Sequence, residues 1–279
     1  MTTRLAKYHA LGNDYLIGPE AELGHLDGAM VRRLCDRHRG PGADGILLHT
    51  RIAEGSFRVR ILNPDGSEAE KSGNGLRILA RHLWDRRLVG SGDFEVVTAG
   101  GLVRARVLDG GRQVTVEMGR AVFEPASIPI RVDGPRAIDV PLVVGGRTLR
   151  IDAVSMGNPH CVVFLDDISE PLARELGPLL ETHELFPNRT NVQLARVLGP
   201  DSLAIEIWER GAGYTLASGT SSCAAACAAH LKGLCGPSVR VHTPGGVVAV
   251  EIGADFQVTM TGAVQRVCAI DVDDECFAD

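Results

Sequence analysis

The feature that most constrains the fold of this chain is an internal duplication. Three short segments recur in the same order at offsets of 145, 146 and 145 residues: GND at 12–14 as GNP at 157–159, SGN at 72–74 as SGT at 218–220, and TAGG at 98–101 as TPGG at 243–246. One nearly constant offset shared by three motifs indicates two copies of one structural unit. The chain should therefore fold as two similar domains, and a cleft between two domains is a favoured place for a ligand.

The predicted secondary structure repeats in the same way. Residues 57–63 and 203–209 alternate apolar and polar side chains as half-buried strands do, and each is followed by a Gly-rich loop. Helical spacing then covers 76–87 in the first copy, and an Ala-rich helix runs from Cys223 to Gly233 in the second. Each copy thus reads as strand, loop, helix.

Further strands arrive in runs more often than in alternation with helices, which favours an α+β fold with mostly antiparallel sheets. They are expected within 103–108, 114–119, 239–243, 247–253 and 257–262, with helices at 30–38 and 170–186. We expect a first domain of residues 1–122 plus about 264–279 and a second of residues 123–263. The proline-rich stretch 125–141 lies near the expected boundary.

Composition excludes several classes of partner. The 279-residue chain is 44% hydrophobic with a formal charge of −6, and its arginines are scattered, so neither nucleic acid nor an anionic membrane is expected to bind. The N-terminus has no signal-peptide pattern, and no apolar run is long enough to span a bilayer. Seven cysteines, an odd number in a long chain, fit reduced thiols, so we expect a cytoplasmic protein.

The two Gly-rich loops are the candidate ligand site. Ser72 and Ser218 each stand where a helix begins, and the free backbone N–H groups of a helix start bind anions. Each serine could instead be only an N-cap, but its recurrence in both copies favours a shared role. Asn63 and Glu209 precede their serine by nine positions, and Glu209 with Arg210 could bind the ammonium and carboxylate of an amino acid.

Other patterns are better explained as structure. Cys223, Cys227 and His230 share a helix face and, with Cys235, suggest a metal site, but a buried Ala-rich helix explains them and we expect no metal. The Gly-rich segment 40–45 does not end in the Lys-Ser/Thr pair of a phosphate-binding loop, so we expect it to be a structural turn.

Six ordered blocks of the chain resemble the signature blocks of the diaminopimelate epimerase family. They are YHALGNDY (8–15), GPGADGILL (40–48), RILNPDGSEAEKSGNGLR (60–77), GNPHCVVF (157–164), RTNVQ (189–193) and ERGAGYTLASGTSSCAA (209–225). The resemblance implies two pseudo-symmetric α/β domains, each a sheet wrapped around a central helix, with the active site in the cleft between them. It also implies a small-molecule amino-acid substrate, a homodimer, and no metal, pyridoxal phosphate or other cofactor.

The resemblance also assigns roles to residues. Two cysteines flank the substrate α-carbon in that family, and the matching positions here are Ser72 and Ser218. A serine hydroxyl is a far weaker acid than a thiol and needs a neighbouring base. His160 matches a histidine near the active site. The other matches are a set for the distal end of the substrate, Asn63, Asn191, Glu209 and Arg210, and a set for the reacting end, Asn13, Gly73, Asn74, Asn158, Gly219 and Thr220.

We therefore expect an isomerase that converts LL-diaminopimelate to the meso form by two-base proton transfer, with Ser72, Ser218, His160 and Glu209 as its catalytic residues. Two alternatives stay open: an isomerase for a different amino-acid-like substrate, and a binding protein that has lost the chemistry. Cys161 could supply a thiol, although a buried apolar role explains it better. The paired serines could be engineered, but differences at neighbouring positions such as Lys71 and Ala217 favour a natural branch.

Overall fold

The computed structural model describes residues 3–24 and 26–277, which form two compact units. Unit 1 comprises residues 1–117 and 262–279, and unit 2 comprises residues 118–261. The proline-rich stretch lies within unit 2. The expected domain boundaries at 122 and 264 remain a proposal, and residues 278–279 of the expected first domain lie outside the described residues.

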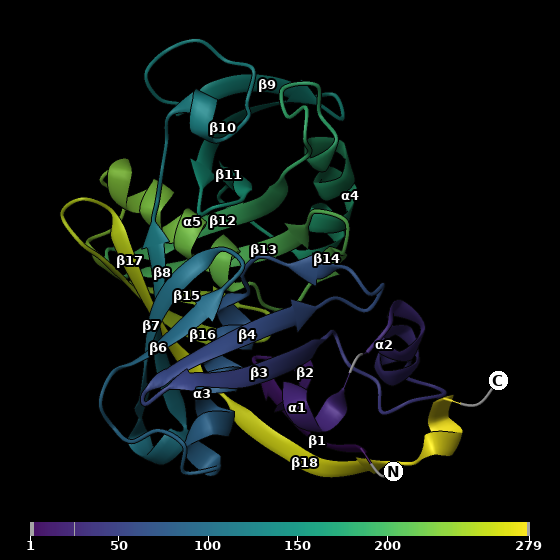
Figure 1. Cartoon of the computed structure of the whole chain (residues 1–279). Helices are drawn as coiled ribbons and strands as arrows, with labels where there is room; N and C mark the ends of the chain where they lie inside the picture. Colours follow the sequence, from purple (N-terminus) through teal and green to yellow (C-terminus); the bar gives the residue numbers. More distant parts are fainter. Residues whose placement is uncertain (1–2, 25, 278–279) are drawn as a thin grey trace. The chain divides into compact units, whose positions relative to one another are not determined.

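Most of the helices and strands of both units are labelled in Figure 1. Those of unit 1 are β1 (Thr3–Ala10), β2 (Asn13–Pro19), α1 (Glu20–Leu23), α2 (Gly28–Cys35), β3 (Ile46–Ala53), β4 (Ser56–Leu62), β5 (Glu68–Ala69), α3 (Gly73–Asp85), β6 (Phe94–Thr98), β7 (Gly101–Leu108), η1 (Asp109–Gly111), β18 (Gln265–Val272) and η3 (Asp274–Phe277).

The elements of unit 2 follow the same plan. They are η2 (Pro125–Ser127), β9 (Val140–Val144), β10 (Arg147–Ser155), β11 (Pro159–Phe164), α4 (Glu170–Glu181), β12 (Asn191–Gly199), β13 (Ser202–Glu209), β14 (Gly213–Thr215), α5 (Gly219–Leu231), β15 (Ser238–Thr243) and β16 (Gly246–Ile252). Two strands, β8 (Gln113–Arg120) and β17 (Gln257–Ala263), contain the residues at which the chain passes from one unit to the other.

Strand pairing confirms the duplication. In unit 1, β1 pairs antiparallel with β2, β2 parallel with β3, β3 antiparallel with β4, β4 parallel with β6, and β6 antiparallel with β7. Unit 2 repeats these five pairings, in the same senses, with β10, β11, β12, β13, β15 and β16. The parallel pairs occur where a helix connects the two strands, because a parallel connection needs a long crossover.

A central helix packs against the sheet in each unit. In α3 the buried side chains of Leu76, Leu79, Ala80 and Leu83 follow helical spacing. Helix α5 is made largely of Ala, Cys and Ser and is buried on nearly all sides, as an apolar helix inside a core is. The prediction of an α+β fold with a sheet wrapped around a central helix is confirmed.

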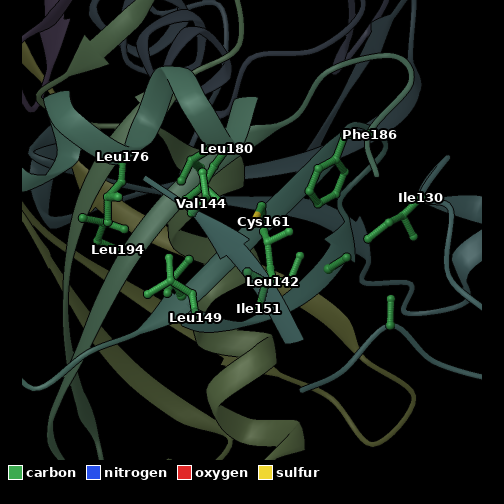
Figure 2. Close-up of a cluster of buried hydrophobic side chains, with 14 of the residues drawn as sticks. Ile130, Leu142, Val144, Leu149, Ile151, Cys161, Leu176, Leu180, Phe186 and Leu194 are labelled. Atoms are coloured by element: carbon green, nitrogen blue, oxygen red, sulfur yellow. The ribbon is translucent and has the colours of Figure 1, made fainter. Parts of the chain in front are cut away.

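The other face of the sheet is covered by a second helix. In unit 1, buried side chains of α2 pack with those of β1 to β4. In unit 2, Leu176 and Leu180 of α4 pack with Leu142, Ile151 and Leu194 of the neighbouring strands (Figure 2). Strands buried on both faces hold the loops at their ends in place, and these loops carry the candidate site residues.

The predicted elements match the observed ones except at their ends. The helix expected over 76–87 begins earlier, at Gly73, because Ser72 caps it and the Gly-Asn-Gly turn is held helical despite its low propensity. The helix expected over 170–186 ends at Glu181.

Candidate active site

The start of α3 holds the Ser72 hydroxyl in a fixed orientation. Ser72 has an extended backbone and caps the helix, and its Oγ accepts a hydrogen bond of 3.1 Å from the Gly75 N–H. The same Oγ lies 3.3 Å from the hydroxyl of Tyr15, which comes from β2. The Ser72 hydroxyl is therefore held at the positive end of a helix and paired with a phenol.

Two asparagines meet beside this hydroxyl. Asn13 begins β2, and its Oδ1 accepts a hydrogen bond of 3.0 Å from Asn74 Nδ2 in the first turn of α3. Asn13 Nδ2 donates to Asp44 Oδ2 at 2.9 Å, and Asn74 Oδ1 accepts from the fully buried Arg77. These partners fix which end of each amide is the oxygen, so Asn13, Gly73 and Asn74 form one ordered group with Ser72.

A charge cluster supports Asn13 from the next residue. Asp14 lies 2.8 Å from Lys7 Nζ and 2.7 Å from Arg37, and Arg37 also contacts Asp44 at 2.7 Å. Burial alone would raise the pKa of Asp14, but the hydrogen bonds from Arg37 and Lys7 outweigh it and lower the pKa to about 2. Asp14 is therefore ionised at neutral pH and anchors the start of β2.

Asn63 lies in a tight turn directly after β4. Its N–H donates to the Ser67 carbonyl at 2.8 Å, its carbonyl accepts from the Gly66 N–H, and its Nδ2 donates to Ser67 Oγ at 3.0 Å. The turn orients the Asn63 side chain, and one Nδ2 hydrogen is not used by this hydrogen bond.

The start of α5 differs from that of α3. Ser218 is the N-cap residue and is 6% exposed, but within the described part of the chain its side chain makes no capping hydrogen bond to the helix. Hydroxyls lie one turn along: Ser222 Oγ donates to the Ser218 carbonyl at 2.9 Å, and Ser221 Oγ accepts from Gln193 Nε2 at 3.0 Å. Gly219 and Thr220 form the first turn between them.

His160 is a fully buried neutral imidazole on β11. Its Nε2 pairs with Asn158 Oδ1 at 2.9 Å, which places the ring proton on Nε2 because a carbonyl oxygen only accepts. Burial lowers the pKa of His160 to about 3, and the positive charge of Arg210 acts in the same direction. The ring therefore orients Asn158 and is uncharged at neutral pH.

The turn after β13 carries Glu209 and Arg210. Asn191 Oδ1 accepts the Arg210 backbone N–H at 3.0 Å, and Asn191 Nδ2 donates to the Pro159 carbonyl at 2.9 Å. Glu181, at the end of α4, accepts the Gly211 N–H at 3.0 Å. Glu181 Oε2 also accepts the indole N–H of Trp208, on β13, at 2.7 Å. The turn is thus fixed by two buried side chains, while the Arg210 side chain is exposed.

The structure brings the predicted residues together within each unit. In unit 1, Asn13, Ser72, Gly73 and Asn74 meet at the start of α3, and Asn63 directly follows the strand that precedes this loop. In unit 2, His160 of β11 pairs with Asn191 of β12, Asn158 directly precedes β11, and Asn191 binds the turn of Glu209 and Arg210.

Sequence reasoning missed the polar residues that hold this arrangement. These are Tyr15, Asp44, Glu181, Gln193 and Ser221. Some of them could have been found from the sequence as polar side chains within apolar strands, such as Gln193 on β12, because a buried polar group needs a hydrogen-bond partner.

The cysteines considered in the sequence analysis, Cys161, Cys223, Cys227 and Cys235, are all buried. Cys161 is fully buried in the core of unit 2, and burial raises the pKa of its thiol. Cys223 and Cys227 are fully buried on α5. Among residues 3–24 and 26–277, no group of three or more His, Cys, Asp or Glu side chains could hold a metal ion. None of the helices in the same residues combines the length and apolar composition that crossing a membrane requires.

Comparison with known proteins identifies the family. The family model for diaminopimelate epimerase matches residues 5–124 and 152–267. The chain belongs to the diaminopimelate epimerase family. It is 47% identical over 274 residues to diaminopimelate epimerase 2 of a Nostoc species, which covers 98% of this chain and 96% of that protein. It is 45% identical to the diaminopimelate epimerase of Desulforudis audaxviator, covering 94% and 96% of the two chains.

Solved structures share the fold of this epimerase-family chain at low sequence identity. A hydroxyproline epimerase from Agrobacterium vitis superposes with a TM-score of 0.72 at 16% identity, covering 97% of this chain and 92% of that one. A predicted epimerase from Pseudomonas aeruginosa gives a TM-score of 0.67 at 18% identity and covers 97% and 99%. These likenesses concern the fold alone.

Proposed function

We propose that this protein is an isomerase that converts LL-diaminopimelate to meso-diaminopimelate by two-base proton transfer at the α-carbon. The observation that carries the proposal is 47% identity, over 98% of the chain, to a protein named diaminopimelate epimerase. The paired helix starts, one in each unit, support it, because an epimerase needs one proton-transfer group for each face of the carbon.

Under this proposal the residues divide into two sets. Ser72 and Ser218 remove and return the α-proton, and the first turns of α3 and α5, with Gly73, Asn74, Gly219 and Thr220, bind the reacting carboxylate through backbone N–H groups. Asn13 and Asn158 orient the same end, and His160 acts by orienting Asn158.

The second set recognises the distal amino-acid group. Glu209 and Arg210 bind its ammonium and carboxylate, with Asn63 and Asn191 as amide partners. Asn191 already fixes the Arg210 backbone, so it acts partly by positioning that turn. A racemase for a simple amino acid would have no use for this second clamp.

The serines make the chemistry demanding. A serine hydroxyl is about as weak an acid as water, whereas a thiol has an ordinary pKa of about 8.5, several units lower. This gap is much larger than the contribution of a helix N-terminus, which is at most about 2 kcal/mol. A serine that acts as a base therefore needs a further proton acceptor.

Exchange of the α-proton in heavy water tests the function. Purified protein is incubated with LL-diaminopimelate in D₂O, and loss of the α-proton signal is followed by NMR while chiral chromatography follows the meso isomer. We expect exchange and isomerisation in the wild-type protein and neither in Ser72→Ala or Ser218→Ala. Exchange with another amino acid alone would identify a different substrate, and binding without exchange would identify a non-catalytic homologue.

Two further features are proposed with the function. We expect a homodimer in the cytoplasm, as the family resemblance and the composition suggest. Light scattering coupled to size-exclusion chromatography would give a mass twice that of the 29.7 kDa chain for a dimer, and the monomer mass would contradict it.

A further inference from the structure

Tyr15 is placed to move protons to and from Ser72. Its hydroxyl lies 3.3 Å from Ser72 Oγ, and either oxygen can be the donor. Tyr15 is a buried residue, 7% exposed. Gly45 makes room for the ring, because a Cβ at that position would lie 2.6 Å from Tyr15 Cε1.

Strand β2 aims two groups at the start of α3. Asn13 and Tyr15 are two residues apart, so their side chains leave the same face of the strand. Asn13 contacts Asn74, and Tyr15 contacts Ser72. The strand therefore positions an amide and a phenol hydroxyl beside the same helix turn.

The duplication places a ring at the matching position of unit 2. The offset of 145 residues that carries Asn13 to Asn158 carries Tyr15 to His160. Both units thus have an ionisable ring two residues after the asparagine, and both rings are buried. The Tyr15 ring contacts the serine, whereas the His160 ring contacts the asparagine.

The charged groups on the elements around Tyr15 pair with each other. Lys7 of β1, Asp14 of β2, and Arg37 and Asp44 of the loop after α2 form one cluster of ion pairs. Arg77 of α3 donates to Asn74. Tyr8, opposite Tyr15 on β1, donates to Asp85. The Tyr15 hydroxyl itself lies 3.3 Å from Ser72 Oγ.

We propose that Tyr15 is the proton relay of Ser72 in the reaction proposed above, on which this inference rests. As Ser72 Oγ takes the α-proton, its own hydroxyl proton passes to the Tyr15 phenolate. The Cα–H and old Ser O–H bonds break, a new Ser O–H and a Tyr O–H bond form, and the negative charge moves from the phenolate to the substrate carbon. In the reverse direction Ser72 donates its proton and the Tyr15 phenol replaces it.

The relay lowers the barrier that a lone serine faces. A phenol has an ordinary pKa of about 10, several units below that of an alcohol. With the relay, the negative charge before proton abstraction is on the Tyr15 phenolate, so no serine alkoxide has to form. Tyr15 acts through Ser72 and is a positioning residue, while Ser72 touches the substrate.

Four variants, compared with the wild-type protein and with Ser72→Ala, test the relay by α-proton exchange and by the pH dependence of kcat. Tyr15→Phe removes only the hydroxyl, and we expect kcat to fall at least about 100-fold with loss of the rise in rate that phenol ionisation causes at alkaline pH. Tyr8→Phe is the matched control, because it removes a buried tyrosine hydroxyl from the neighbouring strand, and should change kcat by less than about twofold.

The remaining two variants replace the serine. In Ser72→Cys the thiol ionises without a relay, so at a pH where it is already thiolate with or without Tyr15, adding Tyr15→Phe should change the rate by less than about twofold. If Tyr15→Phe keeps the wild-type rate and pH profile while Ser72→Ala abolishes exchange, the relay is refuted. An equal loss on Tyr15→Phe in both the serine and the cysteine backgrounds would also refute it, as a purely structural effect.

A measurement without substrate separates this inference from the proposed function. In Ser72→Cys, the rate at which iodoacetamide alkylates the thiol at position 72 is followed against pH by peptide mass spectrometry. A hydroxyl that donates to the thiolate stabilises it and lowers the thiol pKa, so adding Tyr15→Phe should move the midpoint of the rate profile to higher pH by about one unit. An unchanged curve refutes the coupling, even if the wild-type protein proves inactive on diaminopimelate.

Discussion

Replacing Asp14 by Asn should destabilise unit 1 in a pH-dependent way. The Asp14 side chain is 11% exposed and lies 2.8 Å from Lys7 Nζ and 2.7 Å from Arg37. Its pKa falls from 3.8 to about 2, which corresponds to about 2 kcal/mol of folding free energy at neutral pH. The asparagine variant also leaves Lys7 without its counterion, so a loss of about 2 to 3 kcal/mol is expected.

The sign of the pH dependence follows from the lowered pKa. The unfolded chain binds the proton more tightly, so the stabilisation by Asp14 is complete above about pH 4 and is lost as the pH falls towards 2. Denaturant unfolding at several pH values between 7 and 3 measures the difference between the wild-type protein and Asp14→Asn. That difference should be largest near neutrality and shrink in acid.

Asp93→Asn is the matched control. Asp93 forms a two-bonded pair with Arg106 at 2.6 and 2.8 Å, but both side chains are at least half exposed, so a much smaller effect is expected. A loss for Asp14→Asn that is independent of pH, or no larger than that of the control, would refute the assignment of the lowered pKa to the buried ion pairs.

Two further substitutions test the support of the site. Gly45→Ala places a methyl group 2.6 Å from a Tyr15 ring carbon, so we expect the free energy of unfolding to fall by about 1 to 3 kcal/mol, measured by thermal or denaturant unfolding. Gly90→Ala is the control, because its methyl group meets no atom within 4 Å and should leave stability nearly unchanged. Equal effects of the two substitutions would contradict this. Glu181→Gln weakens the hydrogen-bond acceptor that holds the turn after β13, so KM for diaminopimelate should rise about tenfold with a smaller change in kcat. Glu175→Gln, an exposed change on the same helix, is the control and should leave KM unaltered. A loss confined to kcat would argue against a role of Glu181 in positioning the turn for substrate binding.

The duplication made much of the fold readable from the sequence. Repeated Gly-rich motifs gave the two copies, and alternating segments gave β4 and β13 to within a residue or two. The parallel pairs within each sheet were not expected, because alternation shows which face of a strand is buried and says nothing of the direction of its neighbour.

The contacts of the site were less accessible than its residues. The family resemblance gave the serines and asparagines, but the partner of a polar side chain depends on strand register. From the sequence alone Tyr15 is indistinguishable from an ordinary core aromatic residue. Only the 3.3 Å distance between its hydroxyl and Ser72 Oγ shows that it lies at the candidate site. Glu181 closes a turn nearly thirty residues away in sequence.

The unlike capping of the two serines has a kinetic consequence. Ser72 Oγ is held by a backbone N–H and a phenol, whereas Ser218, in the described part of the chain, has no such cap. An isomerase built from unequal partners would turn over its two stereoisomers with different kcat values. The equilibrium constant belongs to the reactants alone and fixes the ratio of the two kcat/KM values, so any change in the ratio of the kcat values must be matched by an equal change in the ratio of the KM values. Progress curves started from each isomer would reveal that imbalance.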